Sequence, residues 1–152
     1  MKTTPEVITS LNKNEIFIFG SNSAGRHGLG AAKTAKDKFG AEYGVGKGLT
    51  GRCYAFPTKY EYMGKYLRTL PLDLIREEFI DLFSCCDSLP EYEFLLTKVG
   101  TGLAGYSVKD IVGCFKDLSI PANLSMPAEF WKELDTYKTG NRSNNAANIV
   151  SQ

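Results

Sequence analysis

Histidine and metal-binding cysteine patterns are scarce in this sequence. It has one histidine, His27, and four cysteines, none of them in a Cys-x-x-Cys pair. A Cys/His zinc site therefore has little support, and we expect neither a metal nor a cofactor. The sequence also lacks an apolar run long enough to span a membrane and an N-terminal signal-peptide core. We expect a soluble protein of the reducing cytoplasm with no membrane partner.

An excess of charge of either sign is lacking too. The 152 residues include 18 Lys and Arg against 17 Asp and Glu, which gives a formal net charge of +1. Nucleic acid is therefore not expected as the main partner, although a local basic patch stays open. With 43% hydrophobic residues, a chain of this length can bury the core of one domain without disulfides.

Short apolar runs alternate with amphipathic segments along the chain. The runs predict strands at 16–19, 52–56, 94–99 and within 120–125, with Pro57 ending the second. Apolar spacings of three and four predict helices at 29–39, 71–86, 107–115 and from Pro127. The fold class predicted is α/β, with three layers and a mixed, partly parallel sheet flanked by helices. One domain should cover residues 1–136, followed by a polar, flexible C-terminal tail at 137–152.

Two helix boundaries carry specific signals. Gly40 follows the first helical pattern as a left-handed C-terminal residue would. Ser107, with Asp110 three residues later, predicts a capping box. Cys85 and Cys86 lie in the apolar pattern of the second helix, so we expect core-facing or half-exposed thiols there.

Two of the predicted strands run directly into glycine clusters. The first loop, residues 20–30, contains four glycines, and the second loop, residues 100–105, reads Gly-Thr-Gly-Leu-Ala-Gly. Ligands of open α/β sheets bind beyond the carboxyl ends of the strands, and the helices that follow favour anions at their N-termini. One such loop alone could be only a tight turn. Two together favour a diphosphate held between them.

Neither loop matches the common nucleotide-binding motifs. The Walker A pattern, Gly-x-x-x-x-Gly-Lys-[Ser/Thr], is absent. The second loop does contain Gly-x-Gly-x-x-Gly, but it falls late in the chain with no acidic residue about 20 positions further at a strand end. A Rossmann interpretation is therefore weak.

The order of these motifs resembles the macro-domain family over about residues 16–124. A strand, "GSN", a glycine loop and a small-residue helix come first, and a strand, "VGTGLAGY" and a helix follow. The segment "RHGLGAAKTAKDKFGA" is similar to compact macro-type proteins of phages and bacteria. The resemblance implies a macro-domain-like fold that binds ADP-ribose or a ligand containing it. It also implies a cytoplasmic location, in the host cytoplasm if a phage encodes the chain.

The resemblance further implies which residues contact the ligand. Asn22 matches the residue that contacts the distal ribose, and the second loop matches the segment that wraps the diphosphate. The implied ligand-binding residues are Gly20, Ser21, Asn22, Gly25, Arg26, His27, Gly28, Gly30, Gly100, Thr101, Gly102, Leu103, Ala104, Gly105 and Tyr106. From the residues alone, Asn22 could equally form a turn, His27 and Arg26 could be solvated, and Tyr106 could be a core aromatic.

Two residues are candidates for catalysis. One macro-domain branch, which removes ADP-ribose from glutamate or DNA bases, has a lysine after a strand like "CYAFPTK", and Lys59 matches it. The aspartate that the same branch has in the second loop is Ala104 here. His27 is the alternative proton donor. The family's acidic residue near the start, which reads adenine, has no clear match ahead of Ile16.

The function predicted is therefore binding or sequestering of an ADP-ribose-type nucleotide, with ADP-ribosylated macromolecules as further possible partners. The alternative is an ADP-ribosyl glycohydrolase that uses Lys59 as nucleophile or His27 as proton donor. A structural protein whose loops bind nothing is a third interpretation. Two further features stay open: Lys98 is either solvated or directed to the pocket, and Tyr60, Tyr62 and Tyr66 either stack on a base or cover the sheet.

Overall fold

The computed structural model describes residues 1–138 of the chain. A mixed sheet with the strand order β2-β3-β1-β5-β6 forms the centre, and β4 pairs with β3. The strands are β1 (Glu15–Asn22), β2 (Gly48–Thr50), β3 (Cys53–Tyr62), β4 (Tyr66–Thr69), β5 (Glu93–Leu96) and β6 (Leu124–Ser125). Pairs β3–β1, β1–β5 and β5–β6 are parallel, whereas β2 and β4 run antiparallel to β3. The predicted α/β class with a partly parallel sheet is confirmed.

The central strand β1 is buried on both faces because its apolar residues alternate between two cores. Ile16 and Ile18 belong to the larger core, and Phe17 and Phe19 belong to the smaller one. Successive side chains of a strand point to opposite faces of the sheet. A continuous apolar run is therefore what a strand between two helical layers requires.

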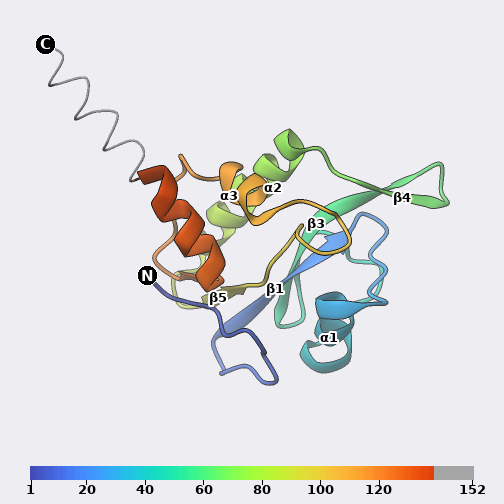
Figure 1. Cartoon of the computed structure of the whole chain (residues 1–152). Coiled ribbons are helices and arrows are strands. Elements are labelled where there is room, and N and C mark those ends of the chain that lie inside the picture. The colour runs from blue at the N-terminus through green and yellow to red at the C-terminus, as the bar shows by residue number, and fades with distance from the viewer. Residues whose placement is uncertain (139–152) are drawn as a thin grey trace, which may run out of the picture.

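Helices cover both faces of the sheet (Figure 1). Helix α1 (Gly30–Phe39) closes the smaller core with Ala32, Ala35 and Phe39. The larger core lies under α2 (Leu72–Ser88), α3 (Val108–Gly113) and a helical segment at 128–138. The two predicted boundary signals are confirmed: Gly40 has a left-handed φ of 78°, and Ser107 and Asp110 form a capping box.

Pro57 does not end its strand, so that prediction is wrong. β3 continues to Tyr62 and turns back as β4. Pro57 lies where the pairing of β1 with β3 slips: Ser21 faces Pro57, but the next residue, Asn22, faces Lys59. Proline is tolerated at such a bulge, because a ladder hydrogen bond is already missing there.

The two ends of the described chain meet at one side of the sheet. Thr3 forms a bridge with Met126, and the indole N–H of Trp131 donates to the carbonyl oxygen of Lys2 at 2.7 Å. Tyr137 and Lys138 still belong to the final helical segment. The remainder of the tail predicted at 137–152 lies outside the described residues. Over residues 1–138, no helix is long and apolar enough to cross a membrane.

The cysteines are reduced and three of them are buried. Burial raises the pKa of the Cys53 thiol to about 12 and that of Cys114 to about 11. Burial also raises the pKa of the Cys86 thiol and that of the half-buried Cys85 thiol. Because the thiolate is the reactive form, none of the four thiols has the environment of a nucleophile.

We expect thiol reactivity to follow this burial. With an aromatic disulfide reagent between pH 7 and 9, Cys85 should react first, and the other three only at the rate of unfolding. The measurement is absorbance of the released thiolate, with urea-unfolded protein as the four-thiol reference. Rapid reaction of a second thiol in the native protein would contradict the burial of the remaining cysteines.

Candidate functional site

A cavity of about 610 Å³ lies between the first and second loops, a size typical of small-molecule sites. We call it the glycine-loop cavity. The parallel strands β1 and β5 bring the two loops to the same edge of the sheet. Its lining residues are Gly20, Ser21, Asn22, Arg26, Gly28, Leu29, Gly30, Ala31, Ala32, Thr58, Lys59, Leu67, Thr97, Lys98, Val99, Gly100, Thr101, Gly102, Leu103 and Ala104. Of the predicted ligand-binding residues, the structure brings all here except Gly25, His27, Gly105 and Tyr106.

The glycines that line the cavity differ in what the fold requires of them. Gly100 is required by the fold: its φ is 78°, and a Cβ there would lie 2.5 Å from Cδ1 of Ile111. Gly28 and Gly102 have no positive φ, and a Cβ at either would meet nothing within 4 Å. The fold therefore does not require glycine at these two positions, where its effect is to keep the loops open toward the cavity.

Several backbone N–H groups at the cavity are free. Leu29 is the N-cap of α1, but no side chain caps this helix, and its first turn holds no acidic residue. Within the described chain, the N–H groups of Gly30–Ala32 and of Gly102–Ala104 donate to no protein acceptor. Free amides at a helix N-terminus and in a glycine loop form the arrangement that binds anions.

The charged residues that line the cavity are all cations. Arg26, Lys59 and Lys98 line it, and no Asp, Glu or His does so. Arg26 is partly neutralised, since its Nη2 lies 3.6 Å from Oε2 of Glu61 outside the lining. Together with the free amides, these cations favour an anionic ligand.

Asn22 has a structural role in the first loop. Its side-chain Nδ2 donates to the carbonyl oxygen of Arg26 at 2.9 Å, and its Oδ1 accepts from the N–H of Arg26 at 3.2 Å. Both ends of the amide are thus used to close the loop, as in the turn interpretation. Asn22 nevertheless lines the cavity, and its bridge presents Arg26 there.

The second loop is fixed from outside the cavity. The hydroxyl of Tyr106 donates to the carbonyl oxygen of Leu70 at 2.7 Å, and Oγ1 of Thr69 donates to that of Ala104 at 3.1 Å. Tyr106 packs against the larger core and does not line the cavity. Its place in this structure is therefore that of the core aromatic, and it ties the loop to the end of β4.

His27 belongs to the first loop, but it is buried and does not line the cavity. Its ring is 1% exposed and packs edge-on against Phe19, with the ring centroids 5.1 Å apart. Nε2 lies 3.0 Å from the carbonyl oxygen of Glu42. Because a carbonyl only accepts, Nε2 carries the proton and donates it. The structure therefore gives His27 contacts that support the loop and does not bring it to the cavity as a proton donor.

The β3–β4 hairpin contributes residues that the sequence did not single out for this site. Thr58 and Leu67 line the cavity beside Lys59. The hairpin also supports the first loop, because the N–H of Glu61 donates to Oγ of Ser23 at 2.8 Å. A strand that ended at Pro57 would not form this hairpin, so the sequence-based prediction does not include its contribution. The bulge at Thr58 is a property of the pairing with β1, which only the tertiary structure defines.

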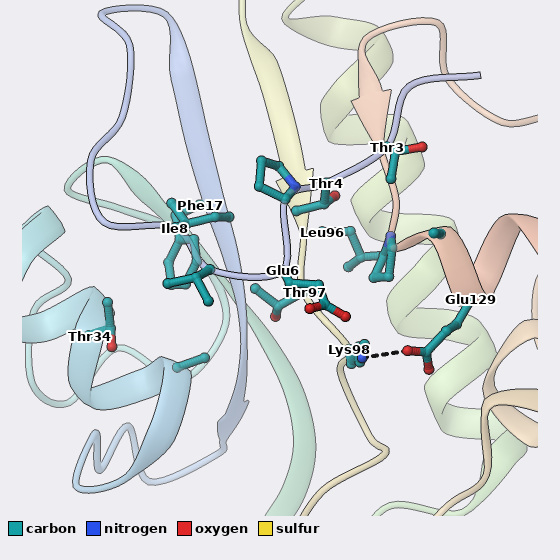
Figure 2. Close-up of a pocket in the computed structure, with 15 residues that line it drawn as sticks. Thr3, Thr4, Glu6, Ile8, Phe17, Thr34, Leu96, Thr97, Lys98 and Glu129 are labelled. Atoms are coloured by element: carbon teal, nitrogen blue, oxygen red, sulfur yellow. Dashed lines mark hydrogen bonds and ion pairs between the residues drawn. The ribbon is translucent and has the colours of Figure 1, made fainter.

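A second cavity of about 570 Å³ adjoins the first, and we call it the N-terminal cavity (Figure 2). Both cavities share Ala31, Thr97 and Lys98 as lining residues. Residues 3–8 form one wall, and no motif in the sequence predicts their part in a cavity. The hydrogen bond and ion pair of Lys98 with Glu129, at 2.6 Å, raise the pKa of the lysine.

The N-terminal cavity is apolar with a few polar groups. Ile8 and Phe17 line it on the side opposite the Lys98–Glu129 pair (Figure 2). Glu6 adds a carboxylate. Thr4 is buried, and among the described residues its Oγ1 has no hydrogen-bond partner. Apolar walls with isolated polar groups are typical of small-molecule sites.

Comparisons of the chain with protein-family models, with curated proteins and with solved structures found no match.

The buried position of His27 predicts a stability defect when it is replaced. His27→Ala removes the buried ring contact with Phe19 and one of the two hydrogen bonds to the carbonyl oxygen of Glu42, which keeps only the N–H of Val45 among the described residues. We expect the free energy of unfolding to fall by about 2–3 kcal/mol in urea denaturation.

Lys13→Ala, at an exposed position outside both cavities, is the control and should change stability by less than about 0.5 kcal/mol. Native stability of His27→Ala, combined with loss of ligand binding, would instead place His27 at the ligand.

Proposed function

We propose that the chain binds ADP-ribose or a close derivative in the glycine-loop cavity, as a binding or sequestering module with a macro-domain-like fold. The observation that carries the proposal is the combination of free amides and three cations between the two loops, with no carboxylate among the described residues that line the cavity. Glu61 and Glu129 pair with Arg26 and Lys98 only from outside the lining, so the cavity surface itself favours an anionic ligand. ADP-ribosylated macromolecules would be recognised through the same group.

The diphosphate is the part of the ligand that this cavity suits best. The N-terminus of α1 and the amides of Gly102–Ala104 supply two sets of donors, one from each loop. A diphosphate has two phosphoryl groups and can accept from both sets at once. The resemblance of the two loops to macro domains supports the same placement.

The adjoining N-terminal cavity offers room for the remainder of a dinucleotide. A ligand held at the shared residues Thr97 and Lys98 would reach both cavities. The apolar side chains of Ile8 and Phe17 suit a flat heterocycle, and the Glu6 carboxylate can accept from an exocyclic amine. Glu6 thereby becomes the candidate for an acidic base-reading residue.

Hydrolysis of an ADP-ribose conjugate is the second candidate function, because Lys59 lines the cavity. A lysine acts as a nucleophile only as the neutral amine, and proton transfer needs an acid or base nearby. No carboxylate or histidine from residues 1–138 lines this cavity, and the loop position of the family's aspartate is Ala104. These residues favour binding over turnover.

Gly102→Glu tests the diphosphate site. The position has open space around it, so the fold should persist, whereas the new carboxylate would block and repel a phosphate. We expect ADP-ribose binding, measured by calorimetry, to fall below detection.

The matched control is Ser84→Glu, which adds the same charge at an exposed position of α2 and should bind like the wild type. A folded Gly102→Glu variant with wild-type affinity would refute the placement. No heat of binding for wild-type protein with ADP-ribose would refute the proposed function.

Lys59→Ala separates binding from hydrolysis. Removing a cation that lines the cavity should weaken ADP-ribose binding about tenfold, and wild-type protein should release no ADP-ribose from modified protein or DNA. Calorimetry and chromatographic detection of released ADP-ribose are the two measurements.

Lys65→Ala, on the same hairpin but outside the cavity lining, is the control. Release by the wild type, abolished in Lys59→Ala at unchanged affinity, would make the protein a hydrolase.

A further inference from the structure

We propose that the outer face of the β3–β4 hairpin binds single-stranded nucleic acid. This face is formed by Tyr60, Tyr62, Tyr66 and Arg68, and we call it the tyrosine face. The inference rests on the hairpin alone and does not depend on the proposed nucleotide function.

Cross-strand pairing gathers the four side chains on one face. Tyr60 pairs with Arg68, and Tyr62 pairs with Tyr66. Directly opposed residues of an antiparallel pair share a face, and so do residues two apart along a strand. The intervening pairs, Lys59–Thr69 and Glu61–Leu67, occupy the other face. Because Lys59 and Leu67 line the glycine-loop cavity, the tyrosine face is directed away from it.

These tyrosines belong to neither hydrophobic core, and two of them are exposed. Neither core includes any of the three, so they do not cover the sheet. Tyr62 is 39% exposed and Tyr66 is 59% exposed. The hairpin itself extends beyond the rest of the sheet (Figure 1).

An arginine is stacked within the same face. The guanidinium carbon of Arg68 lies 3.8 Å from the ring centroid of Tyr62. An ordered guanidinium beside aromatic rings provides planar surfaces for bases and a donor for phosphate at the same place. Base–aromatic stacking of this kind does not depend on sequence, because every base has a π-face.

The charge of the hairpin is complementary to a polyanion. Residues 59–69 hold three basic residues and one acidic residue, a net charge of +2, whereas the whole chain has +1. The acidic residue, Glu61, lies on the opposite face and pairs with Arg26. The near-neutral charge of the chain therefore conceals a basic hairpin with an acid-free tyrosine face.

The hairpin tip keeps a residue that costs stability. Met63 has a φ of 54°, a left-handed conformation that favours glycine or asparagine, and its side chain is 78% exposed. Lys65 follows two residues later. A strained, exposed apolar residue beside the tyrosine face has no packing role and extends the surface that a base can contact.

Fluorescence anisotropy with labelled oligo(dT) and oligo(U) of about 12 nucleotides tests the proposal. We expect wild-type protein to bind both single strands at low salt and to bind more weakly as salt increases. The double variant Tyr62→Ala/Tyr66→Ala should lose at least about tenfold in affinity for the strands. Its ADP-ribose affinity should match that of the wild type, because neither tyrosine lines the glycine-loop cavity or the N-terminal cavity. Its melting temperature should also match, because neither tyrosine belongs to a core.

Tyr43→Ala is the matched control, because Tyr43 is 64% exposed and has Lys36 over its ring but lies outside the hairpin. It should leave strand binding unchanged. No strand binding by the wild type at about 100 µM protein would overturn the proposal, as would an unchanged double variant. Equal binding of an acidic peptide, insensitive to the tyrosines, would overturn it in favour of a purely electrostatic protein contact.

Discussion

The parallel pairing of β1 with both β3 and β5 is the constraint on which the rest of the molecule depends. Parallel strands end at the same edge, so the first loop, the second loop and the hairpin all leave the sheet together. The pairing is fixed by the apolar run Ile16–Phe19, which fills a core on each face. A shift of β1 by one residue would exchange its two faces and separate the loops.

The site that results is unbalanced in charge. Cations and free amides line the glycine-loop cavity. Two carboxylates from outside its lining form ion pairs with these cations: Glu61 pairs with Arg26, and Glu129 pairs with Lys98. These ion pairs lie at partly exposed positions, where a pair contributes little to stability. An anion that entered the cavity would therefore compete for Arg26 and Lys98 at small cost.

The parts of the molecule that local patterns determine could be predicted from the sequence. The central strand, the helix ends at Gly40 and Ser107 and both glycine loops follow from short-range rules. Features that depend on pairing between distant residues could not be predicted in this way. The continuation of β3 through Pro57 needs the bulge opposite β1, and the N-terminal cavity needs residues 3–8 to lie against Lys98. The sequence predicts His27 to be solvated or at the ligand, because no local pattern reveals that Phe19 and the carbonyl of Glu42 enclose its side chain.

The bridge between Thr3 and Met126 has a consequence for the synthesis of this protein on the ribosome. Residues 3–8, one wall of the N-terminal cavity, leave the ribosome about a hundred residues before their partners Lys98, Met126 and Glu129. The strand β1 likewise waits for β5. Contacts this distant in sequence close late, so one edge of the apolar strand β1 stays unpaired until β5 has emerged. The cavity therefore completes only after Glu129 has emerged, and a product terminated before that residue would lack it.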